Sequence, residues 1–171
     1  GMKDTLIKLR PKNIEDITAV ISLYRPGPMD SIPTYIYNSH HPDEIKYAIP
    51  QLKEILDVTY GCLVYQEQVM QTVRTLAGYS MGRADVIRKA MGKKKVAILE
   101  KEREIFLHGL KDDNGNYIVD GCERRGINLK DANELYDTMM KFGEYAFNKS
   151  HAASYAYVTY YTCLLYTSDA A

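Results

Sequence analysis

Residues 64–92, VYQEQVMQTVRTLAGYSMGRADVIRKAMG, determine the architecture that the rest of the chain follows. The first half of this stretch places apolar residues three or four positions apart, the spacing of one face of an α-helix: Tyr65, Val69, Val73 and Leu76. Gly78 then favours a helix C-terminus, and Ser80 is a good N-cap for a second helix, which Gly92 ends or bends. The stretch therefore predicts two consecutive helices joined by a short turn.

The flanking sequence keeps the helical period. The segments predicted as helices are 13–24, 50–56, 64–77, 80–92, 93–110, 131–142 and a last helix from Ser150 through Thr162. Residues 29–50 contain three prolines and are predicted to form a loop. Near residues 112–121, Asn114-Gly115 followed by Tyr117-Ile118-Val119 predicts a small β-hairpin or ordered loop. The predicted fold class is mainly α, a multi-helix domain with one small hairpin.

Composition limits the function classes. The 22 Lys+Arg residues balance the 22 Asp+Glu residues, so the net charge is zero and gives no global argument for nucleic acid. Cys62, Cys122 and Cys163 form no CxxC pair, which argues against a disulfide framework and a structural zinc site. No stretch approaches the roughly 20 apolar residues of a membrane span, and no signal-peptide pattern opens the chain. We therefore expect a cytoplasmic protein with no membrane contact.

The first candidate for chemistry is a basic run from Arg83 to Lys95, RADVIRKAMGKKK, in which six cations accompany one acid, Asp85. At 100° per residue, Arg88 and Lys89 are neighbours on the predicted helix, away from much of its apolar face. Such a face offsets phosphate charge, and the fork of Arg88 allows two parallel hydrogen bonds to phosphate oxygens. A solvated charged face would have the same composition, so both interpretations stay open at this point.

The second candidate is the segment Phe147-Asn148-Lys149-Ser150-His151, in which Asn148 or Ser150 caps the last predicted helix. A helix N-terminus presents free backbone N–H groups and a partial positive charge. Lys149 adds a full charge there and His151 adds a donor, which together suit an anion. A plain capped helix with a chance lysine and histidine fits the same pattern.

Two further motifs have less defined roles. Tyr65-Gln66-Glu67-Gln68 is either a packed polar network or the wet face of its helix. Arg25-Pro26-Gly27-Pro28 is expected to be structural, because it fixes a bend in the backbone. The sequence has no P-loop motif and no pair of carboxylates typical of a two-metal phosphoryl-transfer site. No metal is therefore expected in this chain.

Four motifs resemble the bacterial DNA polymerase III catalytic (alpha) subunit, of the shorter, DnaE-like class. They are LYRPGPM (23–29), TYGCLVYQEQVM (59–70), LAGYSMGRADVIRKAMGKKK (76–95) and YAFNKSHAASYA (145–156). Their order and spacing also fit the family. The resemblance implies that residues 1–162 are a fragment of the polymerase fingers domain of a larger subunit. Residues 163–171 (CLLYTSDAA) do not resemble the family, and we expect them to be a non-native tail.

In this family the palm domain, which lies upstream, carries the metal-binding aspartates. The resemblance implies that Mg²⁺ in the full enzyme is bound by that palm and that this chain binds none. It implies that the fingers contact the incoming dNTP and the adjacent primer-template DNA during replication. Other implied partners are the palm and further domains of the same subunit and, through the full-length protein, the sliding clamp, the 3′–5′ exonuclease and other replicase subunits. Alone, the fragment is expected to be inactive as a DNA-directed DNA polymerase (a nucleotidyltransferase).

Carried onto matching positions, the resemblance implies that residues of both candidate motifs bind the dNTP triphosphate: Arg88, Lys89, Lys93, Asn148, Lys149 and His151. It leaves Lys94, Lys95 and Arg83 as candidates for contact with DNA. No catalytic residue is expected in this chain. The alternative is a non-enzymatic helical module that binds nucleic acid or protein through its basic face. In that module Arg88 and His151 need not be close in space.

Overall fold

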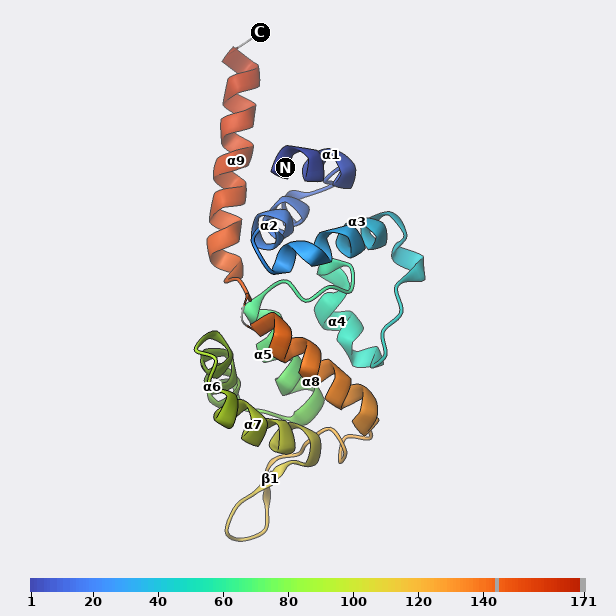
Figure 1. Cartoon of the computed structure of the whole chain (residues 1–171), viewed down its shortest axis with the longest axis vertical. Coiled ribbons are helices and arrows are strands. Elements are labelled where there is room, and N and C mark those ends of the chain that lie inside the picture. The colour runs from blue at the N-terminus through green and yellow to red at the C-terminus, as the bar shows by residue number, and fades with distance from the viewer. Residues whose placement is uncertain (144, 170–171) are drawn as a thin grey trace.

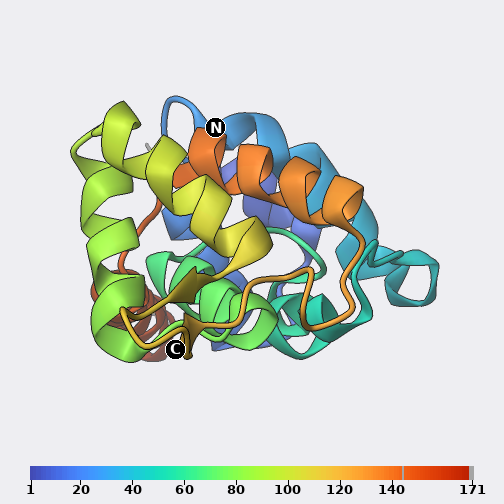
Figure 2. The same ribbon diagram turned by 90° about the horizontal axis from the view of Figure 1, so that it is seen from below.

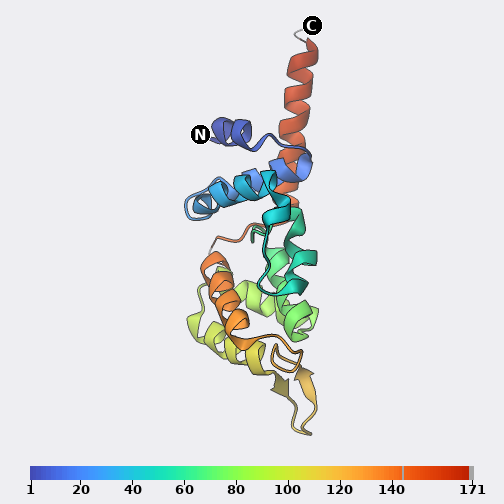
Figure 3. The same ribbon diagram turned by 90° about the vertical axis from the view of Figure 1, so that its right-hand side faces the viewer.

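The computed structural model describes residues 1–143 and 145–169 and shows an elongated molecule with two hydrophobic cores, one above the other (Figure 1). The upper core lies among α1 (Met2–Leu9), α2 (Ile14–Leu23) and α3 (Ile32–His40). The lower core is built from residues between 49 and 139. The side view shows the two lobes along one axis, with the last helix extending beyond the upper lobe (Figure 3).

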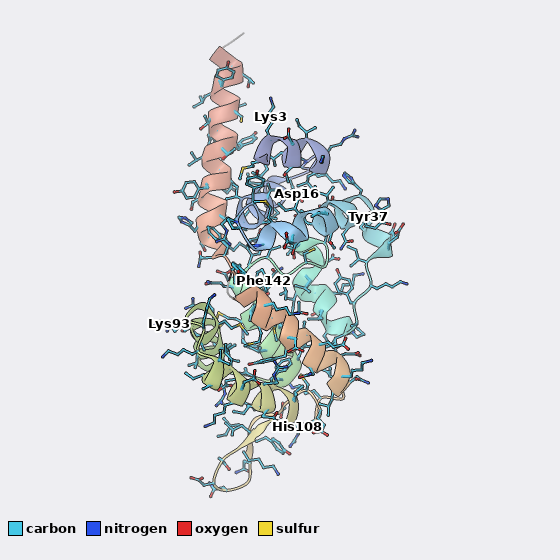
Figure 4. The ribbon with its side chains drawn as sticks, in the orientation of Figure 1. Lys3, Asp16, Tyr37, Lys93, His108 and Phe142 are labelled. Atoms are coloured by element: carbon cyan, nitrogen blue, oxygen red, sulfur yellow. The ribbon has the colours of Figure 1, made fainter. Side chains whose placement is uncertain are left out.

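Asp16 organises the upper core, where it is 2% exposed (Figure 4). Its carboxylate accepts a hydrogen bond from the backbone N–H of Lys12 at 2.7 Å and another from the hydroxyl of Tyr60 at 3.0 Å. Asn13 caps α2, as predicted, by accepting the N–H of Asp16 at 3.0 Å. A buried carboxylate needs such donors, so these bonds tie the start of α2 to the segment that leads into the lower lobe.

Residues 29–50 are not the continuous loop that the sequence predicted. They include α3 and the short 3₁₀ helix η2 (Pro42–Glu44), and their first residues belong to another 3₁₀ helix, η1 (Pro28–Ser31). Pro33 lies in the first turn of α3, where a missing N–H costs no intrahelical hydrogen bond. Tyr35, 1% exposed, then anchors the helix in the upper core. The prediction was wrong because it treated Pro33 as a loop residue, although a proline is equally compatible with the first turn of a helix.

The lower core contains the helices that the sequence predicted. A 3₁₀ turn, η3 (Pro50–Leu52), leads into α4 (Lys53–Leu56); another, η4 (Asp57–Thr59), leads toward α5 (Gln66–Ala77). α5 ends at Gly78, whose φ of +78° places it in the left-handed region typical of a helix C-terminus. Among the side chains of this core that are fully buried are Val73, Leu76, Ile87, Phe106, Tyr136 and Met139.

Three further helices complete the lower lobe. α6 (Met81–Gly92) is capped by Ser80, as predicted, and is followed by α7 (Val96–His108) and α8 (Leu129–Gly143). Gly143 at the end of α8 packs so closely on α6 that a Cβ there would lie 2.6 Å from the Cβ of Met91. The chain therefore leaves α8 beside the C-terminal half of α6, where the basic run lies.

The predicted hairpin is present and confirms a mainly α fold with one small β element. β1 (Leu110–Lys111) pairs antiparallel with β2 (Tyr117–Val119), and Asn114-Gly115 lies in the turn between them. Figure 2 shows the hairpin at the near end of the molecule. At its base, Gly109 and Gly121 face each other: a Cβ on Gly121 would lie 2.3 Å from the backbone nitrogen of Gly109.

The last helix, α9 (Lys149–Asp169), runs upward along α2 and then projects beyond it (Figures 1 and 3). Ala152 and Ala156 are buried, whereas every residue from Tyr157 to Ser168 is exposed. The helix predicted to begin near Ser150 is confirmed and continues through residue 169. The non-native origin of residues 163–171 stays a prediction, and residues 170 and 171 lie outside the described part of the chain.

Within the described residues, no helix combines the length and the apolar content that crossing a bilayer requires.

Candidate functional site

Asp85 holds the two cations at the centre of the basic run. The guanidinium of Arg88 donates through Nε to Asp85 Oδ1 at 2.8 Å, and its Nη2 lies 2.7 Å from the same oxygen. Lys89 Nζ lies 2.6 Å from Asp85 Oδ2. Hydrogen bonds from Lys89 and then from Arg88 lower the pKa of the Asp85 carboxyl group. All three side chains are at least partly exposed, so these ion pairs lie at the surface of α6.

Gln66, the first residue of α5, joins Arg88 to the connector between α8 and α9, which comprises residues 145–148. Its Oε1 accepts a hydrogen bond from Arg88 Nη1 at 3.1 Å. Its Nε2 donates to the carbonyl of Ala146 at 3.0 Å, and its backbone N–H donates to the carbonyl of Phe147 at 3.0 Å. The two candidate motifs, far apart in sequence, therefore meet at residues 146 and 147.

Arg25 holds the connector from the other side. Its Nη2 donates to the carbonyl of Tyr145, and its guanidinium carbon lies 4.3 Å from the centroid of the Phe147 ring. Burial lowers the pKa of Arg25. Gly27, with φ +101°, lets the loop pass beside Tyr145, because a Cβ there would lie 2.7 Å from that ring. The Arg25-Pro26-Gly27-Pro28 motif is thus structural, as predicted, and it supports the candidate site.

The start of α9 carries a cap and an ion pair. Asn148 Oδ1 accepts the N–H of His151 at 3.1 Å, which confirms Asn148 as the cap. The backbone N–H of Lys149 donates to Glu67 Oε2 at 3.3 Å. Lys149 Nζ lies 2.8 Å from Glu15 Oε2 and 5.4 Å from the centroid of the Tyr65 ring. Burial, and after it the charge of Glu15, raises the pKa of Tyr65. Lys149 therefore points into a partly buried niche between α2 and α5.

His151 lies on the surface of the first turn of α9. Its ring packs between two aromatic side chains, with centroid distances of 5.4 Å to Phe147 and 4.9 Å to Tyr155. The exposed imidazole is therefore held in place by stacking and keeps access to solvent. Within the described residues, its connection to Arg88 runs through Phe147 and Gln66 and not through direct contact.

The three lysines at the end of the basic run lie in the turn between α6 and α7. Lys93, Lys94 and Lys95 are exposed, and Lys93 lies on the outer surface of the lower lobe (Figure 4). Lys94 has φ +52°, a left-handed conformation that the turn imposes. Their roles toward a triphosphate or DNA stay predictions.

Arg83 faces inward, toward α7. Its Nε and Nη2 donate to the two carboxylate oxygens of Glu102 at 3.2 and 2.8 Å. Glu102 is 6% exposed and also accepts the hydroxyl of Tyr79 at 3.0 Å. This geometry gives Arg83 a partner inside the fold, so its predicted contact with DNA requires the side chain to leave a buried carboxylate.

The Tyr65–Gln68 motif is a packed polar network, the first of the two interpretations left open by the sequence. Gln68 is 3% exposed; its Oε1 accepts the N–H groups of Val64 and Tyr65, and its Nε2 donates to Thr59 Oγ1 at 2.7 Å. Gln66 and Glu67 reach the connector and α9. Sequence analysis singled out this motif, from three polar residues at the start of an apolar helix, but assigned Gln66 and Glu67 no role in the candidate site.

Of the predicted site residues, Arg88 lies beside the connector, whereas Lys93 to Lys95 lie away from it. Arg88 covers a narrow recess, too small to admit a water molecule, between α5, α6 and the connector, and 31% of its side chain stays exposed. The lining residues are Gln66, Val69, Arg88, Met91, Gly143 and Ala146. The backbone of Asn148 follows directly, whereas Lys93 to Lys95 lie one helical turn or more beyond Arg88. A large anion would therefore meet the exposed edge of Arg88 from outside.

Comparison with known proteins places the chain in a family. A family model described as "Bacterial DNA polymerase III alpha subunit finger domain" matches residues 1–114. The DNA polymerase III subunit alpha of Thermus aquaticus is 47% identical over 167 residues, which cover 95% of this chain and 13% of that protein. The DNA polymerase III subunit alpha of Staphylococcus aureus strain Mu50 is 42% identical over 160 residues, covering 94% of this chain and 14% of that protein.

These alignments extend over nearly the whole chain but over a small part of each relative. The chain spans about one seventh of the length of these curated relatives. The family model and the relatives agree with each other. The chain belongs to the finger domain family of the bacterial DNA polymerase III alpha subunit.

Proposed function

We propose that this chain is the part of a replicative DNA-directed DNA polymerase that binds the triphosphate of the incoming dNTP and the adjacent primer-template. The observation that carries the proposal is the Gln66 link: it joins the guanidinium of Arg88 to the backbone of residues 146 and 147. The cations of α6 and the capped start of α9 thus belong to one continuous structure. A site for three linked phosphates needs several cations and donors held in this way.

In this proposal, the phosphates of the nucleotide displace the carboxylates of Asp85 and Glu15 from the cations with which they are paired. Asp85 holds Arg88 and Lys89 near the surface, and a triphosphate offers these cations more negative charge than one carboxylate does. Lys149 and Glu15 are each more than one third exposed, so their ion pair is weak and a phosphate can replace Glu15. The N–H of Lys149, once released from Glu67, and the imidazole of His151 would then face the same anion.

In this proposal, the metal ions are bound by another domain of the full-length subunit. Among the residues that the structure describes, no group of three or more His, Cys, Asp or Glu side chains is arranged to hold a metal ion. We propose that the Mg²⁺ of the full enzyme is held by the palm, and that the palm, the sliding clamp and the exonuclease meet this chain only through the full-length subunit. This chain contributes binding and orientation of the nucleotide.

Primer extension tests the division of labour. The purified 171-residue chain is expected to extend no primer, because the residues that the structure describes form no carboxylate cluster of the kind that two-metal phosphoryl transfer requires. The measurement is incorporation of labelled dNTP on a primed template with Mg²⁺, with a full-length alpha subunit as positive control. Steady extension by the chain alone would contradict the assignment of chemistry to the palm.

Replacing Arg88 tests the nucleotide site. In a full-length alpha subunit that carries this segment, Arg88→Ala is expected to raise the KM for dNTP by about 10- to 100-fold, because hydrogen bonds to charged groups are worth about 1.5–3 kcal/mol. Arg88→Lys keeps the charge but loses the fork and should fall between Arg88→Ala and the wild type. Steady-state incorporation of one nucleotide measures both variants.

The matched control for this test is Arg74→Ala, which removes an exposed arginine from the last turn of α5. It should leave the KM for dNTP unchanged. If Arg88→Ala behaves like Arg74→Ala, the nucleotide site is wrong and the chain is better described as a helical interaction module.

A further inference from the structure

Gln66 makes polar contacts in two opposite directions. Its side chain is half-buried at the first turn of α5, between α6 on one side and the connector on the other. Oε1 accepts from Arg88 Nη1 at 3.1 Å, while Nε2 donates to the carbonyl of Ala146 at 3.0 Å. The backbone N–H of the same residue donates to Phe147. One residue therefore fixes both a cation and a stretch of backbone.

The chemistry of the neighbours determines the orientation of the amide. A guanidinium only donates and a backbone carbonyl only accepts, so the amide oxygen must face Arg88 and the amide nitrogen must face Ala146. A primary amide satisfies both partners at once. A carboxylate would lack the donor, and a thioether of similar length would lack a strong hydrogen bond to either side. Glutamine at this position is thus matched to both neighbours.

The contacts of Arg88 leave some N–H groups of its guanidinium able to bind a ligand. A guanidinium has five N–H donors. Within the described residues, Nε–H donates to Asp85, one N–H of Nη1 donates to Gln66, and Nη2 is in ion-pair contact with Asp85. The other N–H of Nη1 has no hydrogen-bond partner there, and Nη2 makes no hydrogen bond of its own, so both terminal nitrogens keep a donor for a ligand. Two donors on adjacent nitrogens match two oxygens of one phosphate.

We propose that Gln66 is a positioning residue for nucleotide binding: it fixes the plane of the Arg88 guanidinium and ties it to the backbone that leads into α9. This inference rests on the proposed function. In the alpha subunit, Gln66 acts through Arg88 and does not touch the nucleotide. Its loss leaves the charge of Arg88 and the contact with Asp85 in place but removes the hydrogen bond that holds Nη1, so the plane of the guanidinium is no longer fixed.

The test uses Gln66→Met in a full-length alpha subunit that carries this segment. Methionine keeps the length of the side chain and removes both side-chain hydrogen bonds. The KM for dNTP is expected to rise about tenfold, the equivalent of about 1.4 kcal/mol, while kcat stays within about twofold. The control is Gln71→Met, the same substitution at an exposed position of α5, which should leave both constants unchanged.

A double-mutant cycle separates positioning from a purely structural role. If Gln66 acts through Arg88, Gln66→Met adds no further rise in KM when Arg88 is already alanine. Effects that multiply in the double variant would overturn the inference, and so would an unchanged KM in Gln66→Met. If Arg88→Ala raises KM while Gln66→Met does not, the inference alone fails. If Arg88→Ala is itself without effect, the proposed function fails and the inference falls with it.

Discussion

Replacing Arg83 with alanine is expected to lower the free energy of unfolding by about 3 kcal/mol, because it leaves a buried carboxylate without its cation. Glu102 is 6% exposed and receives two hydrogen bonds from Arg83, so little water can replace the lost partner. Tyr79 remains as a single neutral donor. Chemical denaturation of the purified chain, followed by circular dichroism, measures the change.

A second variant tests the cause of this loss. Arg83→Met combined with Glu102→Leu removes both charges, and it should recover most of the lost stability, since apolar residues of similar size often replace a buried ion pair without penalty. Arg74→Ala, at an exposed position, should change stability by less than about 0.5 kcal/mol. If Arg83→Ala instead keeps full stability but weakens DNA binding by the full-length subunit, Arg83 serves DNA and not the fold.

Gly121→Ala is expected to lower stability by about 3–4 kcal/mol, since a left-handed backbone costs an L-residue about 1–2 kcal/mol and steric overlap adds about 1–3 kcal/mol. Gly121 has φ +80°, and its added Cβ would lie 2.3 Å from the nitrogen of Gly109. The N–H of Gly121 also donates to Ala77 at the end of α5, so a shift of this residue strains the lower lobe. Thermal unfolding should show a melting temperature lower by about 10 °C.

Gly115→Ala is the matched control for this prediction. Gly115 has nearly the same backbone, with φ +82°, but an added Cβ would meet open space. The loss there should be about 1–2 kcal/mol, the cost of the left-handed conformation alone. Equal losses at the two glycines would show that the close approach to Gly109 does not constrain the hairpin base.

Most helices were predictable because their signals are local. Apolar residues three or four positions apart identified α5, and Gly78 and Ser80 marked its end and the start of α6. α3 was missed because a proline in a first turn resembles a proline in a loop until the position of the helix is known. The cap of α9 by Asn148 was also local and was found.

The candidate site was predictable in its charges but not in its connections. Asp85 lies three and four residues before its cations, so their pairing follows from helix geometry. Glu102 and Glu15 are far in sequence from Arg83 and Lys149, and only the packing of helices brings them together. The same holds for Gln66, which lies 80 residues before the carbonyl that it binds. The cations could therefore be identified from the sequence, whereas their distant partners Glu102, Glu15 and Gln66 could be identified only from the fold.

The projecting part of α9 has a mechanical consequence. Its exposed residues, Tyr157 to Ser168, extend about 18 Å beyond the last buried contact with α2, given a rise of 1.5 Å per residue. Ala152 and Ala156, both fully buried, anchor the helix near its start. A tilt of about 10° about this anchor would displace the far end of the helix by about 3 Å.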